Sequence, residues 1–156
     1  MNVHEVVRFA RSTRSLNDLP LAPLLIRLMV GCVFVSEGLQ KFLFPDLVGV
    51  GRFIRIGIPA PEFFAPFVGI VEITCGALVL AGFFSRLAAL PLIINMLVAI
   101  AATKIPILLD EGFWPMAHDS RTDWSMLLGS MFLMIVGAGR WSLDGMNRRR
   151  AMDGDA

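Results

Sequence analysis

Apolar residues dominate four long stretches of this chain, and short segments rich in glycine, proline or charged residues separate them. The stretches are residues 21–44, 63–84, 87–103 and 124–138. A helix needs roughly 17–25 residues to cross the hydrocarbon core of a bilayer, and there its backbone groups must be paired internally. The first two stretches are long enough, the third is barely so, and the fourth needs Trp124 and Trp141 as its interfacial ends. The pattern predicts an all-α integral membrane protein, a four-helix bundle.

The segments between the stretches indicate short connections rather than a second domain. Pro45 ends the first stretch, and glycines and prolines predict an irregular backbone up to Pro61. Residues 82–86 leave room only for a tight link, so the second and third helices are expected to be antiparallel neighbours. A polar loop is expected from Pro106 to Arg121. The predicted organisation is a basic leader, a membrane domain and a tail: residues 1–20, 21–141 and 142–156.

Composition supports the membrane class and narrows the partners. Hydrophobic residues make up 56% of the 156 residues and charged residues 17%, against about 25% charged residues in typical soluble domains. The bilayer is therefore the first expected partner. The formal net charge is +1, which lacks the basic footprint of a nucleic-acid-binding protein. No nucleic-acid partner is expected.

Lysine and arginine set the expected orientation. With four spans, both termini share one side of the membrane, and that side holds eight Lys and Arg residues against five on the other. Loops rich in these residues stay in the cytoplasm. We therefore expect both termini to be cytoplasmic. Arg27 lies within a helix and counts for neither side.

Small residues recur at helical spacing in the first two stretches, and charges share their faces. Gly31 and Gly38 lie on a stripe with Arg27 and Lys41, and Gly69 and Gly76 flank Glu72 in the second stretch. Small residues let membrane helices approach closely. The two stripes are therefore expected to face other helices, and Glu37 and Lys41 are expected to face the bundle interior.

Polar side chains within the spans are the candidate functional residues. A charge at mid-membrane costs about 2.5–3.5 kcal/mol on insertion scales, so Glu72 must be protonated, paired or hydrated. Such a carboxylate is a candidate for proton handling. The predicted catalytic residues are Glu72, Glu37 and Lys41. The predicted cofactor-binding residues are Arg27, Gln40 and Asn95.

Each of these residues also has a structural interpretation. Glu37 and Lys41 can pair with each other one turn apart, and Arg27 can extend to the headgroups. A hydrogen bond that involves the Glu72 side chain can simply hold two helices together. Asn95 is expected first as an interhelical hydrogen-bond donor.

Thiols and histidines give weaker signals. Cys32 and Cys75 form no CxxC motif and are expected to be packing thiols, with a redox pair as the alternative. His118, with Asp119 and Asp123 nearby in the sequence, is weak evidence for a metal site. The sequence predicts no metal centre.

Three motifs together resemble the DoxX family of small membrane proteins. They are "GLQK" at residues 38–41, "GIPAP" at 57–61 followed by a Gly–Glu–Gly helix and "GFFSR" at 82–86, and "GAGRWSLD" at 137–144. The similarity covers about residues 20–145, and Ser36 departs from a histidine that relatives often carry there. The resemblance implies a four-helix protein of the bacterial cytoplasmic (inner) membrane. Relatives include a subunit of a thiosulfate:quinone oxidoreductase and proteins linked to thiol and oxidative-stress systems.

Three functions follow from the resemblance and the charges. The first is a membrane subunit of a quinone-linked redox system, with a quinone as the cofactor. The second is a non-catalytic scaffold that recruits soluble redox enzymes, and the third is a small proton-linked carrier. Redox-enzyme subunits and a second copy of the chain are the protein partners that these functions leave open.

Overall fold

The computed structural model describes residues 21–146 of the chain, and this part is helical without a strand. Its helices are α2 (Leu21–Leu43), α3 (Val50–Arg55), α4 (Pro61–Ala81), α5 (Ser85–Asp110), α6 (Phe113–Asp119) and α7 (Arg121–Val136). The predicted all-α class is confirmed for these residues.

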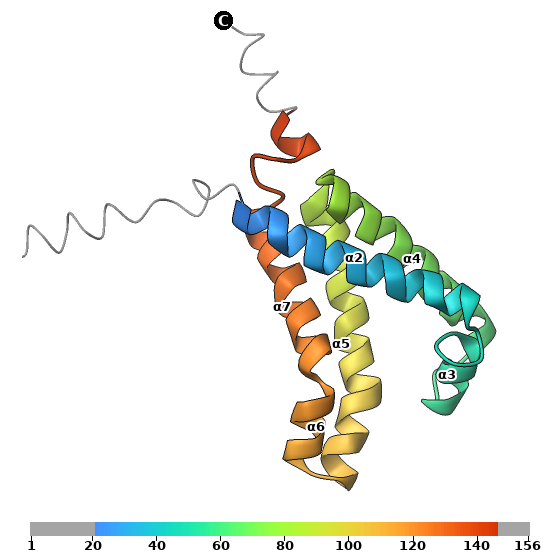
Figure 1. Cartoon of the computed structure of the whole chain (residues 1–156). Coiled ribbons are helices and arrows are strands. Elements are labelled where there is room, and N and C mark those ends of the chain that lie inside the picture. The colour runs from blue at the N-terminus through green and yellow to red at the C-terminus, as the bar shows by residue number, and fades with distance from the viewer. Residues whose placement is uncertain (1–20, 147–156) are drawn as a thin grey trace, which may run out of the picture.

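The four long helices form two pairs that meet at one end and diverge at the other. α2 packs along α4, and α5 packs along α7. Figure 1 shows the two pairs converging near the α4–α5 turn and separating toward α3 and α6. We call the converging end the closed end and the end with α3 and α6 the open end. A fully buried core lies where the pairs meet: Val30, Phe34, Val79, Leu92 and Leu133.

Glycines bring α2 and α4 into backbone contact, as their spacing predicts. A Cβ atom on Gly38 would lie 2.7 Å from the carbonyl oxygen of Gly69, and one on Gly31 would lie 2.9 Å from that of Gly76. Neither carbonyl can move without displacing a helix. The two stripes therefore set the separation of the first helix pair.

Arg27 and the segment after α7 hold the closed end together. The Arg27 guanidinium is buried and donates to the carbonyl oxygens of Val79 (2.9 Å) and Leu80 in α4, and to that of Trp141 (2.6 Å). These groups include carbonyls that the end of a helix leaves without a partner. Asp144 accepts from the backbone N–H of Phe84 at 3.1 Å, at the start of α5. Residues 137–144 therefore lie against the α4–α5 turn.

The predicted tight link between the second and third helices is confirmed. α4 ends at Ala81 and is capped by Gly82, whose φ of 68° lies in the left-handed region that glycine adopts without strain. Phe84 then also takes a positive φ of 48° before α5 begins at Ser85. Only three residues separate α4 from α5, which explains why the chain reverses so sharply here.

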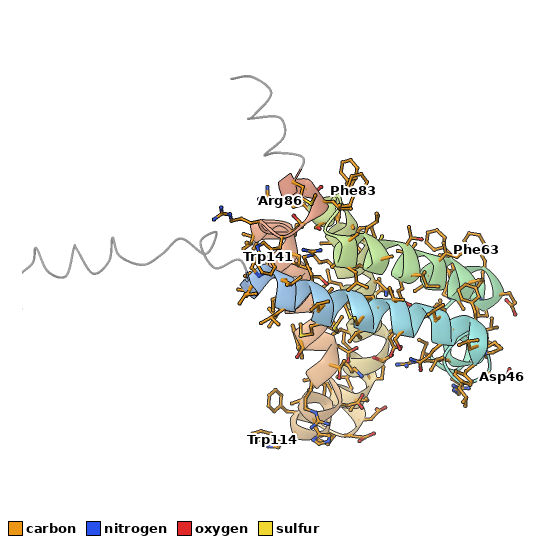
Figure 2. All side chains as sticks on the ribbon, turned by 45° about the horizontal axis from the view of Figure 1, so that its top comes forward. Asp46, Phe63, Phe83, Arg86, Trp114 and Trp141 are labelled. Atoms are coloured by element: carbon orange, nitrogen blue, oxygen red, sulfur yellow. The ribbon has the colours of Figure 1, made fainter. Side chains whose placement is uncertain are left out.

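Three of the described helices are long and apolar enough to cross a membrane: α2, α4 and α5. The predicted four-helix count is not reached by this measure, because α7 has 16 residues and ends at Gly137, where φ is 86°. Figure 2 shows Phe63, Trp114 and Trp141 extending away from the helices, and their side chains are exposed. Exposed tryptophans such as Trp114 and Trp141 are typical of membrane interfaces.

Two predicted connections and one predicted helix end were wrong. The third helix does not stop near Thr103, since α5 continues through Pro106 to Asp110. Proline can bend a helix without ending it, and the apolar residues Ile107, Leu108 and Leu109 extend the apolar surface. α6 forms in the loop that was expected to be polar, and α3 forms within the stretch that was expected to be irregular.

Candidate functional site

A cavity of about 360 Å³ lies between the two helix pairs toward the open end. That volume is within the usual range for small-molecule sites, about 300–1,000 Å³. Its apolar lining comes from all four long helices and from α3: Val33, Phe34, Phe53, Val68, Val98, Ala99 and Met126. Six charged side chains also reach it: Glu37, Lys41, Arg52, Glu72, Lys104 and Asp123. An apolar cavity with a few convergent polar groups is the usual form of a ligand site.

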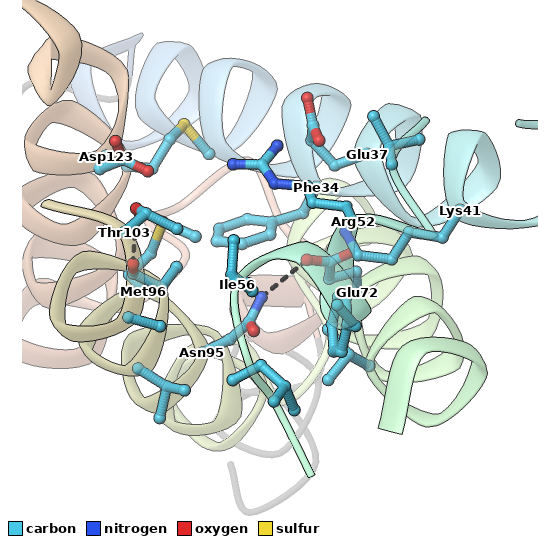
Figure 3. A pocket seen from close by; sticks show the side chains of 18 of the residues that line it. Phe34, Glu37, Lys41, Arg52, Ile56, Glu72, Asn95, Met96, Thr103 and Asp123 are labelled. Atoms are coloured by element: carbon cyan, nitrogen blue, oxygen red, sulfur yellow. Dashed lines mark hydrogen bonds and ion pairs between the residues drawn. The ribbon is translucent and has the colours of Figure 1, made fainter. Parts of the chain in front are cut away.

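Glu72 links three helices on the α2 and α4 side of this cavity. Its Oε2 atom lies 2.6 Å from the Lys41 ammonium of α2, and its Oε1 atom accepts from the Asn95 amide of α5 at 2.7 Å. The side chain of Glu72 is 3% exposed and that of Lys41 is 10% exposed. Figure 3 shows the bond from Asn95 and the position of Lys41 beside the carboxylate. The arrangement supplies the paired state that a mid-membrane carboxylate requires.

Glu37 and Arg52 line the same cavity but are not committed to a partner among residues 21–146 by a hydrogen bond or ion pair. The alternative in which Glu37 and Lys41 pair on one helix face was wrong, because Lys41 contacts Glu72 of α4 instead. The expectation that Glu37 and Lys41 face the interior agrees with their place on the cavity wall (Figure 3). Both uncommitted side chains are therefore available to a ligand.

Arg27 and Gln40, two of the predicted cofactor contacts, lie elsewhere. Arg27 is committed to backbone carbonyls at the closed end and does not line the cavity. Gln40 donates to the Ser36 hydroxyl at 3.0 Å on an exposed stretch of α2. The structure thus brings together Glu37, Lys41, Glu72 and Asn95, and leaves these two apart.

A second buried lysine was missed by the sequence reasoning. Lys104 of α5 lies 2.6 Å from Asp119 of α6 and 3.1 Å from Asp123 of α7. Its side chain is 8% exposed, and it lines the cavity together with Asp123. The sequence did contain a signal for this ion pair, because residues 104–123 hold two basic and four acidic residues. The sequence reasoning counted Lys104 only among the five Lys and Arg residues expected on the side opposite the termini.

The Lys104 cluster also changes the chemistry of its outer carboxylate. A hydrogen bond from the Lys104 ammonium, reinforced by its positive charge, lowers the pKa of Asp119 below its ordinary value of 3.8. Asp119 stays 56% exposed, while Asp123 on the cavity side is 21% exposed. The two carboxylates therefore contact the same ammonium from different sides.

Thiols and metal ligands contribute little to this site. Cys32 is exposed and Cys75 is partly buried against the core, and both are free thiols. In residues 21–146 no three His, Cys, Asp or Glu side chains are grouped closely enough to hold a metal ion. His118 lies 3.1 Å from the Arg121 guanidinium. The carboxylates of Asp119 and Asp123 contact Lys104 instead.

Comparison with known proteins gives consistent matches. The DoxX family model matches residues 22–105, more than half of the chain. "Uncharacterized membrane protein Rv3486" of Mycobacterium tuberculosis is 56% identical over 138 residues, which are 85% of this chain and 85% of its own length. "Putative oxidoreductase CatD" of Bacillus subtilis is 27% identical over 124 residues, 80% of this chain and 85% of its own length. No solved structure matches the chain. Together with the apolar helices, these matches show that the chain belongs to the DoxX family of membrane proteins.

Proposed function

We propose that this protein is a membrane subunit of a quinone-linked redox system and that the cavity between the helix pairs holds the quinone ring. The observation that carries the proposal is the buried Lys41–Glu72–Asn95 group on the wall of an apolar cavity of about 360 Å³. The similarity to a protein named as an oxidoreductase adds support. The electron donor is then a soluble redox-enzyme partner.

The lining residues fit such a ring. The apolar side chains of Phe34, Val68 and Ala99 exclude water and offer contact surface to a hydrophobic molecule. A lysine ammonium has three N–H donors, and Lys41 donates one of them to Glu72. Another can reach a ligand oxygen in the cavity. A bound quinone supplies the two-electron, two-proton acceptor chemistry that side chains lack.

The protein's own residues would orient the ring and handle protons. Asn95 and Lys41 each donate to one oxygen of Glu72, which fixes the carboxylate and, through it, the ammonium. Glu37, one turn before Lys41, lines the cavity and can accept a hydrogen bond from a hydroxyl group or hold a proton. In this arrangement Lys41 is the donor, Glu72 its anchor and Glu37 the acceptor.

The same proposal places the protein in the bacterial cytoplasmic membrane, with both termini in the cytoplasm. α7 packs along α5 and serves as a fourth span. Its 16 residues cover about 24 Å at 1.5 Å per residue, and the backbone that follows completes the crossing. The open end and the cavity mouth then face away from the cytoplasm.

Glu72→Gln tests the proposal. The variant keeps the shape and an acceptor for Asn95 but removes the charge that holds Lys41. We expect a short-chain quinone to bind the purified wild type in detergent and to bind the variant about tenfold more weakly, because a hydrogen bond to a charged group contributes about 1.5–3 kcal/mol. Glu62→Gln, on an exposed side chain of the same helix, is the matched control and should bind as the wild type does. No quinone binding to the wild type, or equal binding by both variants, would contradict the proposal.

A further inference from the structure

Two buried lysine–carboxylate groups line the same cavity, one from each helix pair. Lys41 with Glu72 belongs to α2 and α4, and Lys104 with Asp123 belongs to α5 and α7. Figure 3 shows Lys41 and Asp123 on opposite sides of the cavity. The two groups are alike in chemistry, since each presents an ammonium that a carboxylate holds in place.

We propose that Lys104 and Asp123 form the second half of the binding site. The ligand is then an uncharged apolar molecule with oxygen functions at two opposite ends, one contacted by Lys41 and the other by Lys104. This inference rests on the proposed function. It adds a second contact, at Lys104, and it specifies that the ligand carries an oxygen at each end.

The charges of the lining support an uncharged ligand. Three basic and three acidic side chains reach the cavity: Lys41, Arg52 and Lys104 against Glu37, Glu72 and Asp123. Their formal charges cancel, and the further carboxylate on Lys104, that of Asp119, is 56% exposed and lies outside the lining. A charged ligand would leave one sign in excess within an apolar enclosure, where unbalanced charge is expensive. A neutral ligand that accepts hydrogen bonds leaves the balance intact.

Lys104 contacts one carboxylate more than is needed to balance its charge. Asp119 alone, at 2.6 Å, neutralises the ammonium from the exposed side. Asp123 adds a second carboxylate on the cavity side at 3.1 Å, which draws the ammonium toward the cavity. Because an ammonium has three donors, Lys104 keeps one N–H after both contacts. That donor is the one assigned to the ligand.

A pair of ring compounds tests the two-ended site. Duroquinone carries carbonyl oxygens at opposite ends of its ring, and 2,3,5,6-tetramethylphenol carries the same four methyl groups with one oxygen. Their dissociation constants are measured with purified full-length protein in detergent. We expect Asp123→Asn and Lys104→Gln to weaken duroquinone binding about tenfold, the effect of one charged hydrogen bond. Binding of the phenol should change less than twofold.

Asp119→Asn is the matched control, because Asp119 contacts the same ammonium but does not line the cavity. It should bind both compounds as the wild type does. Thermal unfolding of each variant checks its fold, and Asp123→Asn decides the matter if Lys104→Gln does not fold.

Three results would overturn the inference. If Asp123→Asn bound duroquinone as tightly as the wild type does, the proposed second contact would be refuted. Equal losses in Asp119→Asn and Asp123→Asn would show that the cluster only stabilises the fold. Equal losses for duroquinone and the phenol would exclude a contact specific to the second oxygen. In each of these cases, weaker duroquinone binding by Glu72→Gln would still support the proposed function. Failure of the wild type to bind duroquinone would contradict both the proposed function and this inference.

Discussion

The closed and open ends of this protein use buried cations in different ways. At the closed end, Arg27 donates to backbone carbonyl oxygens of α4 and of the segment after α7. At the open end, Lys41 and Lys104 contact the carboxylates of other side chains beside a cavity. All three cations lie in apolar helices of the structure.

The partner, rather than the charge, distinguishes a structural cation from a functional one. Backbone carbonyls at a helix end need donors, and a planar guanidinium with five N–H groups can serve several of them at once. A lysine ammonium has three donors, so Lys41 with one carboxylate keeps two of them and Lys104 with two carboxylates keeps one. Arg27 therefore completes the fold, while Lys41 and Lys104 remain able to contact a ligand.

The largest expected effect is the loss of Arg27. Arg27→Ala removes this donor from the carbonyl oxygens of Val79, Leu80 and Trp141. The Val79 oxygen keeps the backbone N–H of Gly82, but the other two lose this donor, and each buried unsatisfied group costs about 1–3 kcal/mol. We expect a loss on the order of 3 kcal/mol or more in the free energy of unfolding, measured by SDS titration. Arg86→Ala is the matched control, since exposed Arg86 donates to the carbonyl of Ile135 at 3.0 Å. It should lose only about 0.5 kcal/mol. Equal losses would erase the contrast between buried and exposed arginines.

A double-mutant cycle on Lys41 and Glu72 gives the next largest effect and sharpens the comparison. Lys41→Met alone leaves a buried carboxylate without its counter-charge, at an expected loss on the order of 3 kcal/mol. Adding Glu72→Gln should recover part of it, because the coupling of a contacting pair is about 0.5–3 kcal/mol. No second side-chain change can rescue Arg27 in this way, since its acceptors are backbone atoms. Additive losses at Lys41 and Glu72 in the same titration would show that the pair is not coupled.

The smallest expected effect concerns Asp119 and pH. Its lowered pKa means that the folded state binds a proton less readily than the unfolded state. The stability it contributes is present above the ordinary value of 3.8 and is lost as pH falls through the folded-state pKa. Because Asp119 is half exposed, this contribution is roughly 0.5 kcal/mol or less. Melting temperatures from pH 6 to pH 3 should fall slightly more in the wild type than in Asp119→Asn. An identical pH dependence would mean that the Lys104 contact does not stabilise the folded state.

The sequence predicted the contact between α2 and α4 because that contact depends on local spacing. Gly31 and Gly38 recur on one face of α2, and Gly69 and Gly76 recur on one face of α4. Helical periodicity alone then identifies the faces that can approach closely. The choice of partner for Lys41 depends instead on how far a flexible side chain reaches in three dimensions. Glu37 on its own helix and Glu72 on the next were both available, and only the structure decides between them.

The divergence of the helix pairs could not be predicted from the sequence, for a different reason. Crossing angles follow from how whole helix surfaces pack, and no single motif encodes the cavity that results. Lys104 was counted with the loop because the apolar stretch was taken to end at Thr103, before Pro106. Had the apolar residues after this proline been weighed, Lys104 would have been placed within a helix and treated as a buried charge.

The backbone partners of Arg27 have a consequence for how this family can vary. A carbonyl oxygen is present whatever side chain its residue carries, so the contacts with Arg27 do not restrict the side chains at positions 79, 80 and 141, while position 27 must keep a guanidinium. Positions 41 and 72 follow the opposite rule, because a change of charge at one leaves the other without its counter-ion. An alignment of relatives should therefore show an invariant arginine at position 27, whatever side chains its carbonyl partners carry. At positions 41 and 72 it should show paired substitutions.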